Sequence, residues 1–303
     1  MIPELSAIIP THNSSNYIKK TLLSVINSAN DRTYEIIIID DKSDDIVNLK
    51  KVAAEFKNII IIEKPDKSNA AESRNIGMQL AKGEFIFLID SDDEFKDTHI
   101  NHRINSHKKN DSGIIFGNYI TKSNEEEQPS NLPKYIDGDI RDYIFKLGGD
   151  VRSSTISIHR KKYKGATFDS NQNKHQDWGF LIRAFDKNEN IQFDESHGVI
   201  LDESANPRRM SIKLNAQASN YFLENYVTQS NHLKRFASSH LRLAIYLHDK
   251  ESIIFIRGLY FSSIKNQSNS EKLKITALIV ITFLSTPYIS NRIITLWLKR
   301  WKS

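Results

Sequence analysis

The chain alternates between short apolar runs and longer segments in which apolar residues recur every three or four positions. Apolar runs of four or five residues that end at Pro, Asp or Gly predict buried strands, and the 3.6-residue period predicts amphipathic helices. Strands are expected at Leu5–Ile9, Ile36–Ile39, Ile59–Ile62, Phe85–Ile89 and Ile114–Tyr119, with helices at Ile18–Ala29, Leu49–Phe56 and Ala70–Ala81. Strands that alternate with helices indicate an α/β fold, in which helices cover both faces of a mostly parallel, Rossmann-like sheet.

The second half of the chain has a less regular pattern. Residues 123–133 are polar, which predicts a surface loop or a hinge, and the pattern after about Lys213 is helical to the end. Between these points a helix is expected at Tyr143–Leu147, a strand at Ser154–His159, a buried helix at Trp178–Phe185 and strands at Ile191–Phe193 and Gly198–Leu201. The expected organisation is therefore three segments, residues 1–122, 123–215 and 216–303.

Composition narrows the class of protein. The 303 residues carry a net charge of +5, which is below the density of a dedicated nucleic-acid binder and suits a phosphate-bearing ligand or an anionic membrane surface. The absence of cysteine excludes disulfides, thiolate metal sites and cysteine nucleophiles. The N-terminus lacks the basic segment and long apolar core of a secretory signal, and no run of 18 apolar residues occurs, so we expect a cytoplasmic protein.

The expected strand Phe85–Ile89 ends in three carboxylates, Asp90, Asp92 and Asp93. Carboxylates crowded at the carboxyl end of a strand repel one another unless a cation neutralises them, and ligands of open α/β sheets bind at that end. A divalent ion that carries a phosphorylated ligand would explain the cluster. A solvated acidic turn would explain it equally well, so the cluster alone does not decide.

Four further motifs follow in order along the chain. They are Pro10-Thr11-His12-Asn13, Asp40-Asp41-Lys42-Ser43, Arg74-Asn75-Ile76-Gly77 with Ala81-Lys82-Gly83, and His175-Gln176-Asp177-Trp178. Together with the acidic cluster, and over roughly residues 3 to 215, this set resembles glycosyltransferase family 2. The resemblance implies the GT-A fold, an inverting reaction and a nucleotide-sugar donor. The family usually has glutamate where Gln176 stands.

The resemblance also implies roles on the donor side. Asp41 would accept a hydrogen bond from the imino N–H of the base, which favours uracil or thymine and hence a UDP-sugar. Arg208 or Arg209 would pair with phosphate oxygens, in a segment that would close over the diphosphate, although a plain basic surface loop would explain these residues equally well. Asp92 and Asp93 are the expected ligands of Mn²⁺ or Mg²⁺. The full set expected to bind the donor nucleotide is Pro10, Thr11, His12, Asn13, Asp41, Arg74, Asp90, Ser91, Asp92, Arg208 and Arg209.

On the acceptor side, the resemblance implies that Asp177 is the catalytic base, which takes the proton from the attacking hydroxyl. His175 and Trp178 would line the acceptor site, although Trp178 would equally suit a core position. Residues 1–122 would then bind the nucleotide sugar and residues 123–215 the acceptor, a saccharide or lipid-linked saccharide of bacterial surface polysaccharide or glycolipid synthesis. A non-catalytic sugar-nucleotide-binding scaffold is an alternative. A nucleotidyltransferase is disfavoured because residues 10–16 contain neither glycine nor a basic residue.

The C-terminal residues 216–303 predict a helical extension with its own surface chemistry. Ile275–Leu284 is apolar but too short to span a bilayer, and the basic segment after it places Trp297 and Trp301 four residues apart. Tryptophan and basic residues on one amphipathic helix favour peripheral contact with the inner face of the cytoplasmic membrane. Packing on the catalytic core, or a surface between copies of the chain in a homo-oligomer, would give the same pattern.

Overall fold

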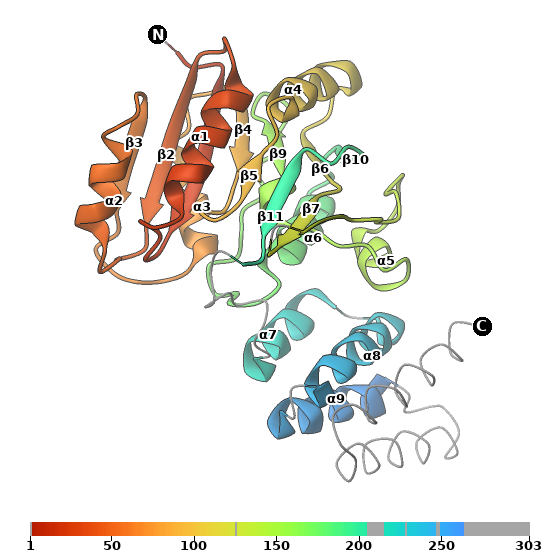
Figure 1. The fold of residues 1–303 in the computed structure, drawn as a ribbon. Coiled ribbons are helices and arrows are strands. Elements are labelled where there is room, and N and C mark those ends of the chain that lie inside the picture. Colours follow the sequence, from red (N-terminus) through yellow and green to blue (C-terminus); the bar gives the residue numbers. More distant parts are fainter. Residues whose placement is uncertain (1, 125, 205–214, 228, 247–248, 264–303) are drawn as a thin grey trace. The chain divides into compact units, whose positions relative to one another are not determined.

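The computed structural model describes residues 2–124, 126–204, 215–227, 229–246 and 249–263 (Figure 1). The chain divides into two compact units, Met1–Arg208 and Arg209–Ser303. Arg208, Arg209, the apolar run Ile275–Leu284 and the basic end of the chain lie outside the described residues. None of the helices in the described ranges combines the length and the apolar character that crossing a membrane requires.

A seven-stranded sheet forms the centre of the first unit. Its order is β10-β6-β9-β4-β1-β2-β3. The strands are β1 (Leu5–Thr11), β2 (Tyr34–Asp40), β3 (Ile59–Glu63), β4 (Phe85–Leu88), β6 (Ile114–Gly117), β9 (Ser157–His159) and β10 (Ile191–Asp194). All neighbours run parallel except β9, which is antiparallel to both β4 and β6. The predicted mostly parallel sheet is therefore confirmed, and strands from residues 1–122 and 123–215 share it.

Helices cover both faces of this sheet, as predicted (Figure 1). They are α1 (Ile18–Ala29), α2 (Ile46–Ala53), α3 (Ala70–Leu80), α4 (His99–Asn110), α5 (Ile140–Phe145) and α6 (Gln176–Asp186). Leu5 and Ile9 of β1 share one buried cluster with Leu22 of α1. On the opposite face of β1, Ile8 meets α3 at Gly77, where a Cβ atom would lie 2.3 Å from Ile8 Cγ2. The glycine of the Arg-Asn-x-Gly motif thus lets α3 lie close to the strand.

A second sheet of order β5-β11-β7-β8 completes the first unit. It comprises β5 (Glu94–Phe95), β7 (Ile120–Ser123), β8 (Glu126–Pro129) and β11 (Val199–Asp202). Two predictions were wrong here. Residues 123–133 are not all loop, because β8 pairs with β7 as an exposed polar strand without apolar alternation. The expected strand at Ile114–Tyr119 already ends at Gly117, and Ile120 begins another.

The described part of the second unit is helical, as predicted. It contains α7 (Ala216–Tyr226), α8 (Ser230–Tyr246) and α9 (Lys250–Ser263). Their buried faces carry apolar side chains that include Phe222, Phe236, Leu241, Ile253 and Ile256. Apolar burial is the main source of stability for such helices.

Candidate active site

The ends of β1 and β2 form the first part of the site. These parallel neighbours finish at the same edge, with Thr11 opposite Asp40 in the register. Asp40 is buried and closes the turn, since its Oδ1 accepts from the Thr11 hydroxyl at 3.1 Å and its Oδ2 from the Ser43 N–H at 2.9 Å. Pro10 is also buried within β1. Both carboxylate oxygens of Asp40 therefore accept hydrogen bonds within the fold. The next carboxylate at this edge, and the next candidate to bind a ligand, is Asp41.

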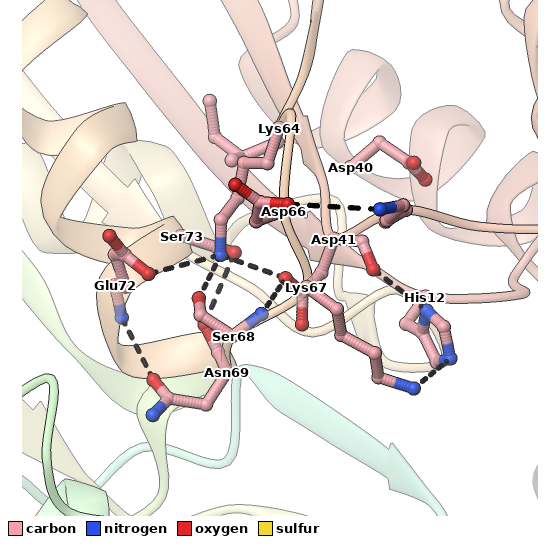
Figure 2. A network of polar contacts seen from close by, with 12 residues as sticks. His12, Asp40, Asp41, Lys64, Asp66, Lys67, Ser68, Asn69, Glu72 and Ser73 are labelled. Atoms are coloured by element: carbon pink, nitrogen blue, oxygen red, sulfur yellow. Dashed lines mark hydrogen bonds and ion pairs between the residues drawn. The ribbon is translucent and has the colours of Figure 1, made fainter.

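Asp41 is held by the segment that follows β3 (Figure 2). Its Oδ1 accepts from Lys64 Nζ at 2.8 Å and from the Ser68 N–H at 2.7 Å. Its backbone carbonyl lies 3.0 Å from His12 Nδ1. Because a carbonyl only accepts hydrogen bonds, Nδ1 carries the proton in this contact. The Nε2 of a neutral ring then accepts from Lys67 Nζ at 2.8 Å.

Asn13 joins the loop after β1 to the loop after β2. Its backbone is left-handed, with φ of 54°. Its N–H donates to Ser43 Oγ at 2.8 Å, and its Oδ1 accepts from the Asp44 N–H at 2.8 Å. The Asn13 side chain therefore braces the loop that carries His12. The structure thus brings His12, Asn13 and Asp41, three residues of the expected donor-binding set, together.

Arg74 links the acidic turn to α6. Its side chain is 5% exposed, its Nη2 lies 2.6 Å from Asp90 Oδ1, and its Nη1 donates to Gln176 Oε1 at 3.2 Å. The guanidinium also lies 5.3 Å from the centre of the Phe168 ring. Burial acts to lower the pKa of Arg74, but the surrounding carboxylates, Asp90 first, raise it above its ordinary value. Arg74 is therefore a fixed cation between Asp90, in the turn after β4, and Asp177 of α6.

The acidic turn after β4 has three carboxylates, of which one is buried and two are partly exposed. Asp93 is 2% exposed, and its Oδ2 accepts from Ser154 Oγ at 2.6 Å while its Oδ1 accepts from the Asp202 N–H at 3.3 Å. The Ser91 hydroxyl donates to Ser14 Oγ at 2.8 Å. Asp90 and Asp92 are partly exposed. Asp93 is thus placed to hold the turn, and Asp92 is better placed to contact a cation.

The fit of a divalent cation depends on this turn. In the part of the chain that the structure describes, no three His, Asp or Glu side chains gather into a ready-made metal site. Mg²⁺ is commonly held by one or two carboxylates together with substrate phosphates. Asp92 fits such an ion if diphosphate oxygens supply further ligands. Asp93, with both oxygens bound within the protein, fits it less well.

Asp177 lies in the first turn of α6, where Ser153 Oγ donates to its Oδ1. Burial raises the pKa of Asp177 above the usual value of an aspartate. Arg74 and Arg152 oppose that rise, and Asp90 adds to it. A carboxylate with a raised pKa is a stronger base, as general base catalysis near neutral pH requires.

His175 and Trp178 lie together beside Asp177. Their rings stack, with centroids 5.1 Å apart and an interplanar angle of 25°. The indole N–H donates to Asp150 Oδ1 at 3.0 Å, and Asp150 Oδ2 accepts from Tyr119 at 2.9 Å and from Arg152 Nε at 2.7 Å. Both stacked rings are half-buried. Trp178 is therefore oriented by Asp150 at the border between core and solvent.

Several residues of the site carry no sequence motif. Ser153 and Ser154 reach it because the antiparallel β9 begins at the edge where β4 ends. Asp150 holds Trp178, and nothing in its sequence context indicated this. The sequence could have predicted the position of Lys64, because this residue directly follows β3 at the same edge of the sheet as Asp41.

Comparison with known proteins places this site in a family. Residues 6–182, more than half of the chain, match the model described as glycosyl transferase family 2. The chain belongs to this family. Among family 2 relatives, the poly(ribitol-phosphate) β-N-acetylglucosaminyltransferase TarP of Staphylococcus aureus is 28% identical over 230 residues, which cover 69% of this chain and 66% of TarP. The amylovoran biosynthesis glycosyltransferase AmsB of Erwinia amylovora is 28% identical over 192 residues, covering 59% and 63%. The chain thus spans just under two thirds of each relative.

The fold agrees with the family. The crystal structure of S. aureus TarS 1-349 in complex with UDP-GlcNAc superposes with a TM-score of 0.59 at 16% identity, over 86% of this chain and 81% of that one. TarS 1-349 without a named ligand gives a TM-score of 0.60 at 17% identity, over 86% and 80%. At these identities the likeness establishes the fold alone, and the predicted GT-A fold is confirmed.

Proposed function

We propose that this family 2 member is an inverting glycosyltransferase. It would move a sugar from a UDP donor to a hydroxyl group of a saccharide or lipid-linked saccharide, in the synthesis of a bacterial surface polysaccharide or glycolipid. The observation that carries the proposal is the position of Arg74, whose guanidinium contacts Asp90 of the acidic turn and Gln176, the neighbour of Asp177. One buried cation thus joins the expected donor carboxylates to the expected base.

The donor would bind at the edge formed by β1, β2 and β4. Asp41 would accept from N3–H of uracil, and His12 offers a flat ring beside it. The likeness to TarS, whose crystal structure holds UDP-GlcNAc, and to TarP, named as an N-acetylglucosaminyltransferase, supports a UDP-sugar. Arg208 and Arg209 stay predictions for the diphosphate.

Asp177 would act as the base of the transfer. The acceptor oxygen forms a bond to the anomeric carbon as the bond to the diphosphate breaks, and UDP leaves with the electron pair. The hydroxyl proton passes to Asp177. Ser153 holds Oδ1 of this carboxylate, so Oδ2 would take the proton. Attack from the face opposite the diphosphate inverts the anomeric configuration, and Trp178 and His175 would line the acceptor.

Metal dependence is part of the same proposal. Asp92, together with diphosphate oxygens, would hold Mn²⁺ or Mg²⁺, which supplies charge neutralisation for the leaving diphosphate. Arg74 would add a fixed positive charge from the protein itself. Peripheral membrane contact through the C-terminal helices, and self-association, also stay predictions.

The test is to measure UDP binding and sugar transfer by Asp177→Asn and by the wild type, with a panel of UDP-sugars and saccharide acceptors. The variant should bind UDP as the wild type does and lose transfer by roughly 10²- to 10⁴-fold, the usual contribution of general base catalysis. Asp186→Asn is the matched control, because Asp186 lies at the other end of the same helix, and its side chain is 48% exposed and pairs with Arg141. Full transfer by Asp177→Asn, or a wild-type protein that binds no UDP in calorimetry, would refute the proposal.

A further inference from the structure

Lys64 is a buried lysine beside the expected nucleobase site. Its side chain is 5% exposed, and its ammonium lies 2.8 Å from Asp41 Oδ1 and 3.4 Å from Glu72 Oε2, with Ser68 Oγ also in contact (Figure 2). Ser68 and then Lys64 hold the pKa of Glu72 below its ordinary value. Lysine is rarely buried without partners, because desolvation of an ammonium is costly. Its partners here are side chains that border the donor edge.

The contacts to Asp41 are one-sided. Lys64 Nζ and the Ser68 N–H both bind Oδ1, so the segment after β3 fixes the plane of the carboxylate. The side-chain hydrogen bonds that Asp41 makes with the described residues all involve Oδ1, and none involves Oδ2. The carboxylate is 10% exposed, which leaves it a narrow opening toward a ligand. Oδ1 of Asp41 is therefore bound within the protein, and Oδ2 can accept a hydrogen bond from a ligand.

An ionised carboxylate only accepts hydrogen bonds. Uracil presents a donor at N3–H, whereas neutral cytosine presents an unprotonated nitrogen at that position, which would face Oδ2 as a second acceptor. Two acceptors that face each other in a site with little water are disfavoured, because neither is satisfied. The choice between the two pyrimidines thus depends on the orientation of the Asp41 carboxylate, with Oδ2 facing the base.

We propose that Lys64 is the positioning residue that sets this choice. By pairing with Oδ1, it holds Asp41 as an oriented, acceptor-only group and so makes the site selective for uracil over cytosine nucleotides. This inference rests on the proposed use of a UDP donor. Lys64 itself touches neither the sugar nor the diphosphate in this proposal, so it acts on donor binding and not on the transfer step.

A neighbouring pair shows why Lys64 differs from an ordinary surface lysine. Glu63, the residue before it, pairs with Lys50 at 2.6 Å, but these side chains are 48% and 49% exposed. Exposed pairs of this kind contribute little, because water screens both charges. Lys50→Met therefore removes a lysine salt bridge at the same strand end without reaching Asp41, and is the matched control.

The experiment is calorimetric titration of UDP and of CDP, each with Mn²⁺, into the wild type and four variants: Lys64→Met, Lys50→Met, Lys64→Met with Asp41→Asn, and Asp41→Asn alone. For Lys64→Met, the Kd for UDP should rise about 10- to 100-fold, the usual effect of losing support for a hydrogen bond to a charged group. The preference for UDP over CDP should fall by a similar factor. In turnover, the donor KM should rise while kcat at saturating donor is retained. Lys50→Met should match the wild type within about twofold.

The third variant, Lys64→Met in an Asp41→Asn background, tests whether Lys64 acts through Asp41. Compared with Asp41→Asn alone, it should show no further change in the UDP to CDP preference, as expected of coupled residues. If Lys64→Met does not fold, as judged by circular dichroism, Lys64→Gln is measured in its place. It removes the charge and shortens the side chain but keeps a neutral donor, so the preference for UDP should fall in the same direction and by less. An unchanged preference would overturn the role of Lys64.

The outcomes separate the two proposals. A wild type that does not bind UDP refutes the proposed function. A wild type that binds UDP, with a Lys64 variant of unchanged nucleotide preference, overturns the role of Lys64 alone. Equal loss of UDP and CDP affinity would also overturn it, since Lys64 would then support the fold without selecting the base.

Discussion

Asp93→Ala separates a structural role from a metal-binding role in the acidic turn. The sequence predicts Asp93 as a metal ligand, but the structure gives both of its oxygens donors within the protein. If those contacts are its function, the substitution should destabilise the first unit whether or not a metal is present. It would leave the buried Ser154 hydroxyl and the Asp202 N–H without their acceptor.

The size of the effect follows from the two distances. The Ser154 contact, at 2.6 Å, is a short hydrogen bond to a carboxylate, a class worth about 1.5–3 kcal/mol. The Asp202 contact, at 3.3 Å, is longer, and we assign it about 0.5–1 kcal/mol. The total of about 2–4 kcal/mol should lower Tm by roughly 4–16 °C, at about 2–4 °C per kcal/mol for a unit of this size.

Scanning calorimetry on three variants gives the measurement, with and without UDP and Mn²⁺. Asp93→Ala should melt early without ligand. Asp92→Ala should melt like the wild type but gain less from UDP with Mn²⁺, because it lacks the expected cation ligand. Asp97→Ala, at an exposed position on the same segment, is the control. If Asp93→Ala melts with the wild type and loses the Mn²⁺-dependent gain, Asp93 is a metal ligand and the structural reasoning is wrong.

Two further predictions concern pH and packing. Because burial raises the pKa of Asp177, the folded state holds its proton to higher pH than the unfolded state does, so this group lowers the free energy of unfolding as pH rises from the unfolded pKa through the folded one. Asp177→Asn should therefore raise Tm at pH 8 but leave it unchanged at about pH 3, which lies below both pKa values. Transfer by the wild type should decline as acid protonates Asp177. An identical Tm difference between variant and wild type at both pH values would contradict this reasoning. Gly77→Ala should cost about 1–3 kcal/mol, because its Cβ would lie 2.3 Å from Ile8 Cγ2 in the buried core; urea unfolding measures this, and an unchanged midpoint would show that α3 can shift away from β1.

The sequence predicts the position of the proposed donor edge in the fold, because that position depends on local patterns. Apolar runs locate β1, β2 and β4, and the carboxyl ends of parallel strands meet at one edge of the sheet, so Asp41 and Asp90 both follow strands that end at this edge. Lys64 follows the same rule, since it directly follows β3. A lysine after a strand is usually solvated, however, and only the three-dimensional structure shows that this one is buried.

The acceptor edge depends on contacts that no local pattern encodes. The apolar alternation of residues 154–159 predicts a strand, but not that β9 runs antiparallel between β4 and β6. The helix α4 was not predicted because three of its buried positions, His99, Arg103 and His107, are polar. For the same reason the sequence could not tell which aspartate of the acidic turn faces inward, since the answer depends on Ser154.

Two adjacent serines hold carboxylates that are more than 80 positions apart in the sequence. Ser154 holds Asp93 and Ser153 holds Asp177, so two neighbouring residues link the acidic turn to the proposed base. An insertion in the exposed segments before these two residues would leave that link unchanged. If Asp177 is the base as proposed, the protein could acquire new acceptors by changes at its surface, while the geometry of proton removal stays the same.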